Sequence, residues 1–282
     1  MEKADITIIG AGVIGLAIAA EIAEPGLNIF ILEKNPTHGS ATSSRNSEVI
    51  HSGMYYPAGS LKASLCVAGR TMLYEIAAHN NIPHKKIGKL VVATKPDETE
   101  EIERLHANAR KNDVRSVAII STRKIAQMEP HITACAALHS PKTGVISAHA
   151  LMNYFLLQAK SKKAQFVYNT KVVRIEKETG GYRVFTENSK NEAFEFSSAV
   201  VINAAGLESD TIANMAGGDY QLHYCKGDYC SISGIKQGTV QRLIYPVPVK
   251  NHVGLGVHLT IDLAGRLKLG PDTAYISRGE NY

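Results

Sequence analysis

Residues 6–33 read ITIIGAGVIGLAIAAEIAEPGLNIFILE, and this stretch decides the fold. A short β-branched run leads into Gly10, Gly12 and Gly15, and an alanine-rich segment with helical composition follows them. A second apolar run then ends at Glu33. Short β-branched runs are typical of buried parallel strands. The order strand, glycine turn, helix, strand and acid predicts a βαβ unit that binds a dinucleotide.

Each of these positions has a physical requirement. Gly10 permits the tight turn, Gly12 lets a pyrophosphate approach the backbone, and Gly15 lets the helix pack closely on the sheet. The N–H groups and the positive dipole end of the helix favour a phosphate. Glu33 lies 18 residues after Gly15 (33 − 15), where a carboxylate can bind ribose hydroxyls. The alternative is an ordinary βαβ turn; a secretory segment is excluded because the glycines interrupt the apolar run.

Composition narrows the class of protein. A chain of 282 residues with 44% hydrophobic content can form one large domain or two intertwined ones. The net charge is +5, and the basic residues form no run of five, so nucleic-acid binding is not indicated. No apolar stretch reaches the roughly 18 residues that a membrane helix needs. The amino terminus enters the first strand almost at once, so we expect no signal peptide.

The cysteines indicate a reducing compartment. Cys66, Cys135, Cys225 and Cys230 form no CxxC pair and suit reduced thiols better than a disulfide framework. The histidines show no ligand spacing such as HExxH, so no metal site is expected. We therefore expect a cytoplasmic protein, with a peripheral membrane contact left open.

The later part of the chain adds a second glycine-containing segment and a change of pattern. A buried strand is expected at 199–203, and it runs directly into Ala204, Ala205 and Gly206, whose small side chains allow close approach. From Tyr220 onward the pattern becomes β-rich. Further elements are expected as a helix at 60–79 and strands at 87–94, 229–233, 243–246, 254–260 and 266–269.

These patterns predict an α/β protein with two interleaved parts. One contains the Rossmann-like dinucleotide-binding unit, a βαβ with a parallel sheet. The other is a β-rich α+β part.

Four segments together resemble a known family. They are the fingerprint ending at Glu33, NSEVIHSGMYYPAGSLKASLC at 46–66, VINAAG at 201–206 and GVHLTIDLAGRLKLGP at 256–271. The chain resembles FAD-dependent oxidoreductases of the D-amino-acid oxidase superfamily over nearly its whole length. The run at 51–56 and the GVHLT segment look most like the L-2-hydroxyglutarate dehydrogenase/oxidase branch.

The resemblance implies a Rossmann-like FAD-binding domain at 1–82 and 141–219 and a β-rich substrate-binding domain at 83–140 and 220–282. It also implies FAD in an extended conformation, with its adenosine end at residues 10–33. The backbone of Val172 would touch adenine, Ala205 and Gly206 would border the diphosphate, and the loop from Ser43 to His51 would pass the flavin. The cofactor-binding residues it implies are Gly10, Gly12, Val13, Ile14, Gly15, Glu33, Lys34, Ser43, Arg45, Asn46, His51, Val172, Ala204, Ala205 and Gly206.

The implied reaction oxidises a small 2-hydroxy acid, L-2-hydroxyglutarate to 2-oxoglutarate, by hydride transfer to flavin N5 while a base takes the hydroxyl proton. His51 and His258 are the candidate bases. A dicarboxylate needs cationic anchors, for which Lys226 is the catalytic-site candidate beside Arg242 and Arg278. For each of these three cations, a surface role is the simpler interpretation.

Several alternatives stay open. The chain could be a flavin-dependent amino acid or amine oxidase of the same fold, a truncated FAD-binding subunit without activity, or an NAD-linked dehydrogenase. Family members usually continue with a glycine-rich turn and a helix that covers the flavin, and the printed sequence ends at Tyr282 before such a segment. We therefore expect this covering segment to be absent. The electron acceptor (oxygen, quinone or protein) and homo-oligomerisation are left open.

Overall fold

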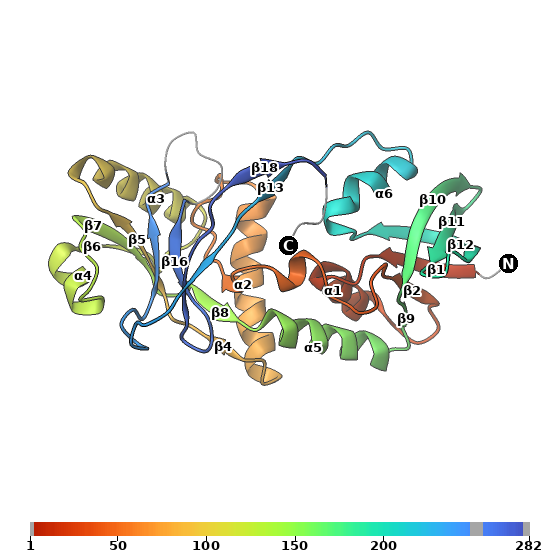
Figure 1. Ribbon diagram of the computed structural model, residues 1–282, viewed down its shortest axis with the longest axis horizontal. Helices are drawn as coiled ribbons and strands as arrows, with labels where there is room; N and C mark the ends of the chain where they lie inside the picture. Colours follow the sequence, from red (N-terminus) through yellow and green to blue (C-terminus); the bar gives the residue numbers. More distant parts are fainter. Residues whose placement is uncertain (1–2, 249–255, 279–282) are drawn as a thin grey trace. The chain divides into compact units, whose positions relative to one another are not determined.

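The computed structural model describes residues 3–248 and 256–278. The chain folds as two compact units, each built from two stretches of sequence (Figure 1). Unit 1 comprises Met1–Asn46 and Ala148–Tyr224, and unit 2 comprises Ser47–Ser147 and Cys225–Tyr282.

Unit 1 contains a six-stranded sheet in the order β10-β11-β12-β1-β2-β9. The middle of the sheet is parallel, since β1 pairs in parallel with both β2 and β12, and β2 pairs in parallel with β9. The strands β10, β11 and β12 continue the sheet in antiparallel fashion. The strands are β1 (Lys3–Ile9), β2 (Ile29–Leu32), β9 (Gln165–Val167), β10 (Thr170–Glu178), β11 (Gly181–Asn188) and β12 (Ala193–Asn203).

Two helices pack together beside the parallel strands of unit 1. They are α1 (Val13–Ile22) and α5 (Ala148–Ser161), and their apolar side chains share one core cluster with Ile8 and Ile31 of the sheet. The remaining elements are α6 (Ser209–Met215) and the 3₁₀ turns η1 (Thr42–Ser44) and η3 (Gly206–Glu208). The predicted strand, glycine turn, helix and strand are therefore confirmed, and β1 begins three residues earlier than expected.

Unit 2 contains a seven-stranded sheet in the order β14-β17-β16-β15-β5-β7-β6. Only the β15–β5 pair is parallel among the described pairs of this sheet. Its strands are β5 (Lys89–Ala93), β6 (Ala118–Ser121), β7 (Ala136–Ser140), β14 (Cys230–Ile232), β15 (Leu243–Pro246), β16 (His258–Ile261) and β17 (Leu267–Gly270).

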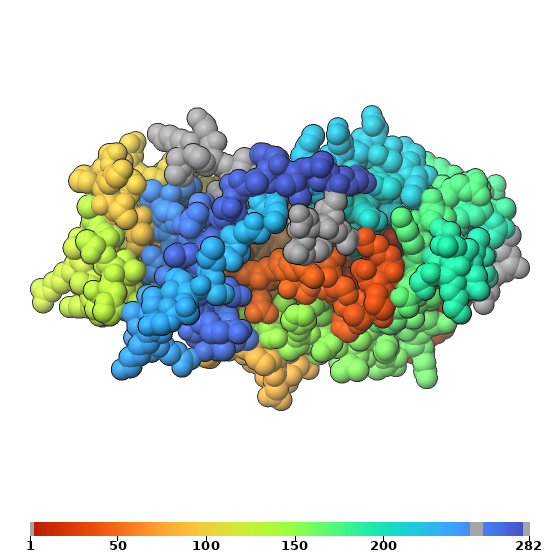
Figure 2. All heavy atoms as spheres, in the orientation of Figure 1, coloured from red at the N-terminus to blue at the C-terminus, as the bar shows by residue number. Residues whose placement is uncertain are grey.

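Smaller elements complete unit 2. A three-stranded sheet has the order β3-β8-β4, and β13 pairs with β18. The helices α3 and α4 lie on the outside of unit 2, in yellow and yellow-green at the left of Figure 2. The helical elements are α2 (Leu61–His79), the 3₁₀ turn η2 (Pro96–Glu98), α3 (Thr99–Lys111) and α4 (Thr122–Met128). The short strands are β3 (Val49–Ile50), β4 (His84–Lys85), β8 (Gly144–Ile146), β13 (Tyr224–Lys226) and β18 (Ala274–Ile276).

The central strand β5 is buried on both faces, so its residues divide between two cores. Val91 and Ala93 pack in the cluster that contains α3, whereas Leu90 and Val92 pack in the cluster that contains Ile125 of α4. Because side chains alternate along a strand, Lys89 lies on the face of Val91. A lysine thus enters the apolar side of this sheet.

The two units divide at different points from the predicted domains. Residues 47–82 and 141–147, expected in the FAD-binding domain, belong to unit 2. The physical reason is pairing and packing: Val49 of β3 pairs with Val145 of β8, and Val67 of α2 packs on the core around Val91. The assignment of cofactor and substrate to the two parts stays a prediction. The strand expected at 254–260 lies partly outside the described residues, and its described part begins β16.

Candidate functional site

The glycine turn of unit 1 has the backbone geometry that its sequence predicts. Gly10 has φ +103°, and a Cβ there would lie 2.4 Å from the carbonyl oxygen of Ala204. A Cβ on Gly15 would lie 1.9 Å from the carbonyl oxygen of Gly10, so this close approach of α1 to the turn requires glycine. Within 4 Å of a Cβ on Gly12, the described residues place only the hydroxyl of Ser43, at 3.0 Å. Apart from the Ser43 hydroxyl, no described atom crowds the Cβ position of Gly12, so its backbone allows the close approach that a pyrophosphate requires.

The first turn of α1 is suited to an anion. Gly12 is the N-cap residue and supplies no side-chain cap, and the first turn contains no acidic residue. The N–H of Val13 donates to Oγ of Ser43 at 2.9 Å, which places the Ser43 loop at the helix start. Ile14 beside it is exposed. The positive end of the helix dipole lies here, and such a helix start favours an anion. The structure thus brings together the predicted cofactor residues Gly12, Val13 and Ser43, and phosphate binding there stays a prediction.

Glu33 faces the glycine turn from the end of β2. Its carboxylate is buried and accepts hydrogen bonds from the N–H of Ala11 at 2.9 Å and from the N–H and side-chain amide of Asn35 at 2.9 and 2.8 Å. A carboxylate has about four acceptor positions. Glu33 therefore retains room for a further donor, such as a ribose hydroxyl, directly beside the turn.

The segment after β12 lies against the same turn. The N–H of Ala204 donates to the carbonyl oxygen of Ile9 at 2.9 Å, and Gly206 has φ +57°. Lys34 forms an ion pair with Glu208, with Nζ and Oε1 3.0 Å apart. Ala204 is thus next to the turn, as expected for residues that border a diphosphate, and the Lys34 ammonium already faces a carboxylate.

Two predicted loop residues turn back onto their own loop. Arg45 donates to the carbonyl oxygen of Ser40, and the side-chain amide of Asn46 donates to the carbonyl oxygen of Ser43 at 2.8 Å. These bonds order the loop that delivers Ser43 to the start of α1. A direct contact of Arg45 or Asn46 with the cofactor stays a prediction.

Val172 lies in the antiparallel part of the unit 1 sheet. Its side chain is buried in the cluster that also contains Leu32 and Ala205. The pairing of β10 with β11 shifts register between Val172 and Arg174, so the ladder is irregular at this point. The adenine contact predicted for the Val172 backbone stays a prediction.

In unit 2, the segment at 51–56 is held in place by three polar side chains. Arg70 of α2 donates to the carbonyl oxygen of Ser52 at 2.9 Å. Asn108 and Asn112 donate to carbonyl oxygens of the same segment at 2.8 to 3.0 Å. These bonds fix the backbone around His51, which positions its ring without relying on a regular strand or helix.

His258 has a defined set of partners. Its Nδ1 is 2.7 Å from the carbonyl oxygen of Gly256, which can only accept, so Nδ1 carries the proton. The unprotonated Nε2 then accepts from the hydroxyl of Tyr229 at 3.2 Å, and the ring stacks on Tyr245 with centroids 3.8 Å apart. Burial lowers the pKa of His258 to about 4, although the bond to Gly256 opposes this shift. The ring is therefore neutral at pH 7.

His51 is also neutral at pH 7. Burial lowers its pKa to about 3, and the positive charge of Lys89 adds to the effect. In the described part of the chain, the sulfur of Cys66 contacts the His51 backbone carbonyl, and the ring accepts no hydrogen bond. Both neutral rings can take a proton, and His51 is the better candidate base because its ring has no described hydrogen-bond partner, whereas both ring nitrogens of His258 are engaged.

Lys89 is a member of this cluster that sequence reasoning missed. It lies on β5 with 0% exposure, and its Nζ is 4.6 Å from the ring centroid of Tyr55 and 4.3 Å from that of Tyr245. The sequence could have indicated this residue, because a lysine inside the apolar strand predicted at 87–94 is expected to be buried away from solvent. We call Lys89, His51, His258, Tyr55 and Tyr245 the lysine–histidine cluster.

The cationic residues that the sequence offered as substrate anchors have other partners. Lys226 lies 3.2 Å from the carboxylate of Asp228, whose side chain is 62% exposed. Arg242 lies 3.0 Å from Glu129, whose side chain is 1% exposed, and also donates to the carbonyl oxygen of Met128. Arg242 is thus part of an internal ion pair. A catalytic role for Lys226 stays a prediction.

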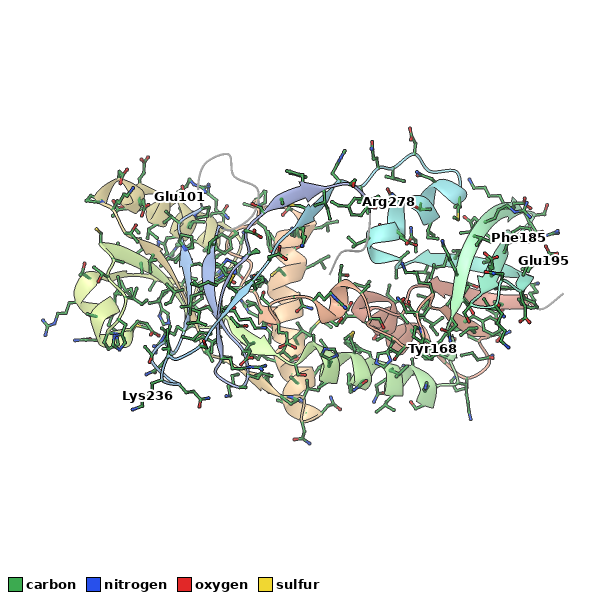
Figure 3. All side chains as sticks on the ribbon, viewed as in Figure 1. Glu101, Tyr168, Phe185, Glu195, Lys236 and Arg278 are labelled. Atoms are coloured by element: carbon green, nitrogen blue, oxygen red, sulfur yellow. The ribbon has the colours of Figure 1, made fainter. Side chains whose placement is uncertain are left out.

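A hollow of about 310 Å³ lies elsewhere, over the antiparallel strands of unit 1. Phe185 and Glu195, labelled in Figure 3, line it with Phe194, and the Arg174 guanidinium lies 3.6 Å from the Phe185 ring. None of the predicted site residues lines this hollow. The candidate site is therefore not there.

Other expectations concern metals, thiols and membranes. Among residues 3–248 and 256–278, no group of three or more metal-ligating side chains is present, and the four cysteines are unpaired. No helix in this part of the chain is both long enough and apolar enough to cross a bilayer.

Comparison with known proteins matches almost the whole chain to one family. A sequence profile described as FAD dependent oxidoreductase (DAO) matches residues 5–281. The chain is 38% identical to a protein named L-2-hydroxyglutarate dehydrogenase, mitochondrial, from Arabidopsis thaliana, over 98% of this chain and 63% of that protein. It is 31% identical to L-2-hydroxyglutarate dehydrogenase of Indibacter alkaliphilus, over 98% of this chain and 69% of that protein. The chain thus spans about two thirds of the length of the curated relatives it matches.

A solved structure shares the same fold. L-alpha-glycerophosphate oxidase from Mycoplasma pneumoniae, with FAD bound, superposes with a TM-score of 0.89 at 27% identity. The match covers 99% of this chain and 73% of that one. The predicted fold class is confirmed.

Proposed function

The chain belongs to the family of FAD dependent oxidoreductases, and from this premise we propose that it oxidises L-2-hydroxyglutarate to 2-oxoglutarate. FAD is the cofactor of the family. The substrate is suggested by the relatives named L-2-hydroxyglutarate dehydrogenase, which are 31 to 38% identical to this chain.

The observation that carries the cofactor proposal is the backbone of Gly12, which only the Ser43 hydroxyl approaches, between a Gly10 turn and a Gly15 contact that both require glycine. The start of α1 and Ser43 would hold the diphosphate, and Glu33 would accept a ribose hydroxyl. When bound, FAD supplies the acceptor for the hydride that leaves the substrate carbon. The residues of unit 1 bind and orient it.

The lysine–histidine cluster of unit 2 supplies the proton chemistry in this proposal. His51 is neutral and its ring is not engaged by a described partner, so its ring nitrogen can take the hydroxyl proton. A carboxylate bound nearby would favour the charged ring and raise the low pKa of His51, which strengthens it as a base. His258 is hydrogen-bonded to Gly256 and Tyr229 and would act as a polar side chain of fixed orientation.

We also propose a location in a reducing aqueous compartment such as the cytoplasm. The support is the set of unpaired cysteines. The names of eukaryotic relatives contain the word mitochondrial, which gives the location of those proteins and not of this chain. Fractionation of the source cells, followed with an antibody, would test this proposal, and recovery with the membranes after a high-salt wash would contradict it.

A substrate panel tests the function. Purified protein with bound FAD is mixed anaerobically with L-2-hydroxyglutarate, its D enantiomer, glycine or L-alpha-glycerophosphate, and the visible flavin absorbance is followed. We expect bleaching by L-2-hydroxyglutarate in preference to the others. Bleaching by glycine alone would support the amine-oxidase alternative, and no bleaching by any of them would support an inactive FAD-binding chain.

A further inference from the structure

The feature that calls for an explanation is the side chain of Lys89. It is 0% exposed, and within the described residues its Nζ has no hydrogen-bond partner. A lysine ammonium has three donors, and burying it without a partner is unfavourable. Two tyrosine rings contact it, but a cation–π contact offsets only part of the lost hydration. The position is therefore suited to an anionic partner.

The groups around Lys89 supply no negative charge. Tyr55 comes from the loop before α2, Tyr245 from β15, His258 from β16, and Cys66 from α2. His51 also feels the charge of Lys89. Burial raises the pKa of both tyrosines, and of Cys66, so these groups are protonated and uncharged near neutral pH.

Two more cations lie in the same region. Lys62 lowers the pKa of His51, and Arg70 and Lys62 both act on Cys66. In the part of the chain that the structure describes, no carboxylate forms an ion pair with Lys89. No carboxylate is among the described groups that shift the pKa values of Lys89, His51 and His258, so this neighbourhood is electrostatically complementary to an anion.

We propose that Lys89 anchors a carboxylate of the substrate, a dicarboxylic 2-hydroxy acid, and takes up a proton from water as the anion binds. The inference rests on the proposed function and names the anchor that the proposed dianionic substrate needs. Arg242 and Lys226 are already paired with Glu129 and Asp228, whereas Lys89 gains its first ionic partner.

The coupling to a proton follows from the burial of Lys89. Burial lowers its pKa to about 7, so at pH 8 most free molecules carry a neutral amine. A bound carboxylate favours the ammonium and restores the higher pKa. Uptake at Lys89 should then rise from about 0.1 proton per bound dianion at pH 6 to about 0.9 at pH 8. Uptake by His51 or His258 would show the opposite trend, because their pKa values start near 3 and 4.

The experiment measures proton uptake and affinity together. The holoprotein is titrated with glutarate, a dicarboxylate without a hydroxyl to oxidise, in weakly buffered solution with a pH-indicator dye at pH 6 and pH 8. Binding is followed through the flavin spectrum. The variants are Lys89→Met, Lys89→Arg and Lys236→Met, the last being an exposed lysine on the outside of unit 2, labelled in Figure 3.

We expect Lys89→Met to weaken glutarate binding at least tenfold and to abolish uptake at pH 8. Lys89→Arg should keep the charge, and therefore much of the affinity, but take up no proton, because arginine stays protonated. Lys236→Met should behave as the unsubstituted protein. If Lys89→Met does not fold, the proton uptake of Lys89→Arg and the pH trend of proton uptake by the unsubstituted protein still test the proposal.

Three results would overturn the proposal. One is unchanged glutarate affinity in Lys89→Met. This result would overturn the proposal even if L-2-hydroxyglutarate reduced the flavin of the variant more slowly. The second is full proton uptake at pH 8 in Lys89→Arg. The third is uptake by the unsubstituted protein that decreases from pH 6 to pH 8. Failure of L-2-hydroxyglutarate to bleach the flavin, with glutarate binding intact, would instead reject the proposed function.

Discussion

Replacing Lys89 by methionine should make the protein more stable and change how its stability depends on pH. Methionine keeps a long unbranched side chain and removes the buried charge. Lys89 is 0% exposed, contacts the Tyr245 ring and lies on the same face of β5 as Val91, so the replacement side chain has apolar neighbours.

The magnitude follows from the pKa of Lys89, which burial lowers from 10.5 to about 7. A tenfold change in a protonation equilibrium corresponds to about 1.4 kcal/mol, so the buried ammonium destabilises the folded state by about 5 kcal/mol well below pH 7 and by about 4 kcal/mol at pH 7, where half of the folded molecules carry it. The two cation–π contacts offset about 1 kcal/mol of this. We therefore expect Lys89→Met to be about 3 kcal/mol more stable at pH 7.

The sign of the pH dependence is also determined. Between pH 7 and 10.5 the unfolded chain binds the Lys89 proton and the folded chain releases it, so this residue makes stability rise with pH. The destabilisation is complete below pH 7 and disappears above pH 10.5. From pH 7 to pH 9 the advantage of Lys89→Met should shrink by about 2 kcal/mol.

Urea unfolding followed by circular dichroism at pH 7 and pH 9 measures both quantities. Lys236→Met is the matched control, since it removes the same charge from an exposed position and should shift stability by less than about 0.5 kcal/mol. A Lys89→Met variant that is less stable at pH 7, or equally more stable at both pH values, would refute the view that Lys89 is a buried, unpaired amine.

Three further outcomes are expected. Gly15→Ala should lose FAD and about 3 kcal/mol of stability, because its Cβ would lie 1.9 Å from a carbonyl oxygen. The control Gly69→Ala, in open space on α2, should gain up to about 1 kcal/mol of stability. FAD content and urea unfolding check both variants. Arg242→Met should lose about 3 kcal/mol by leaving the buried Glu129 unpaired, with glutarate affinity within twofold; a large loss of affinity would make Arg242 an anchor instead. His51→Asn should slow anaerobic flavin reduction at least a hundredfold without changing FAD content, and a smaller effect would remove His51 as the base.

The backbone geometry of the glycine turn was predictable because local sequence determines it. The backbone requirements at Gly10 and Gly15 arise from contacts within one βαβ unit and from the neighbouring segment that contains Ala204. A glycine pattern reports such requirements directly. Ser43 was predicted only as a cofactor-binding residue of the loop that passes the flavin. Its hydrogen bond to the start of α1 was not predicted, since the loop conformation that brings it there has no sequence period.

The unit 2 part was less predictable because its contacts join distant segments. The pairing of β5 with β15 brings Lys89 next to Leu243, and the same sheet brings Tyr245 within reach of His258. No local pattern specifies that register. The unit boundaries differ from the predicted domain boundaries for a similar reason, because the pairing of Val49 with Val145 decides where residues 47–82 belong.

The visible absorption spectrum of the purified protein tests the central claim most directly, that the glycine turn of unit 1 binds FAD. We predict a flavin spectrum with about one FAD per chain and a colourless preparation of Gly15→Ala. A folded, colourless protein that binds no added FAD, or a Gly15→Ala variant that retains full FAD, would contradict the account.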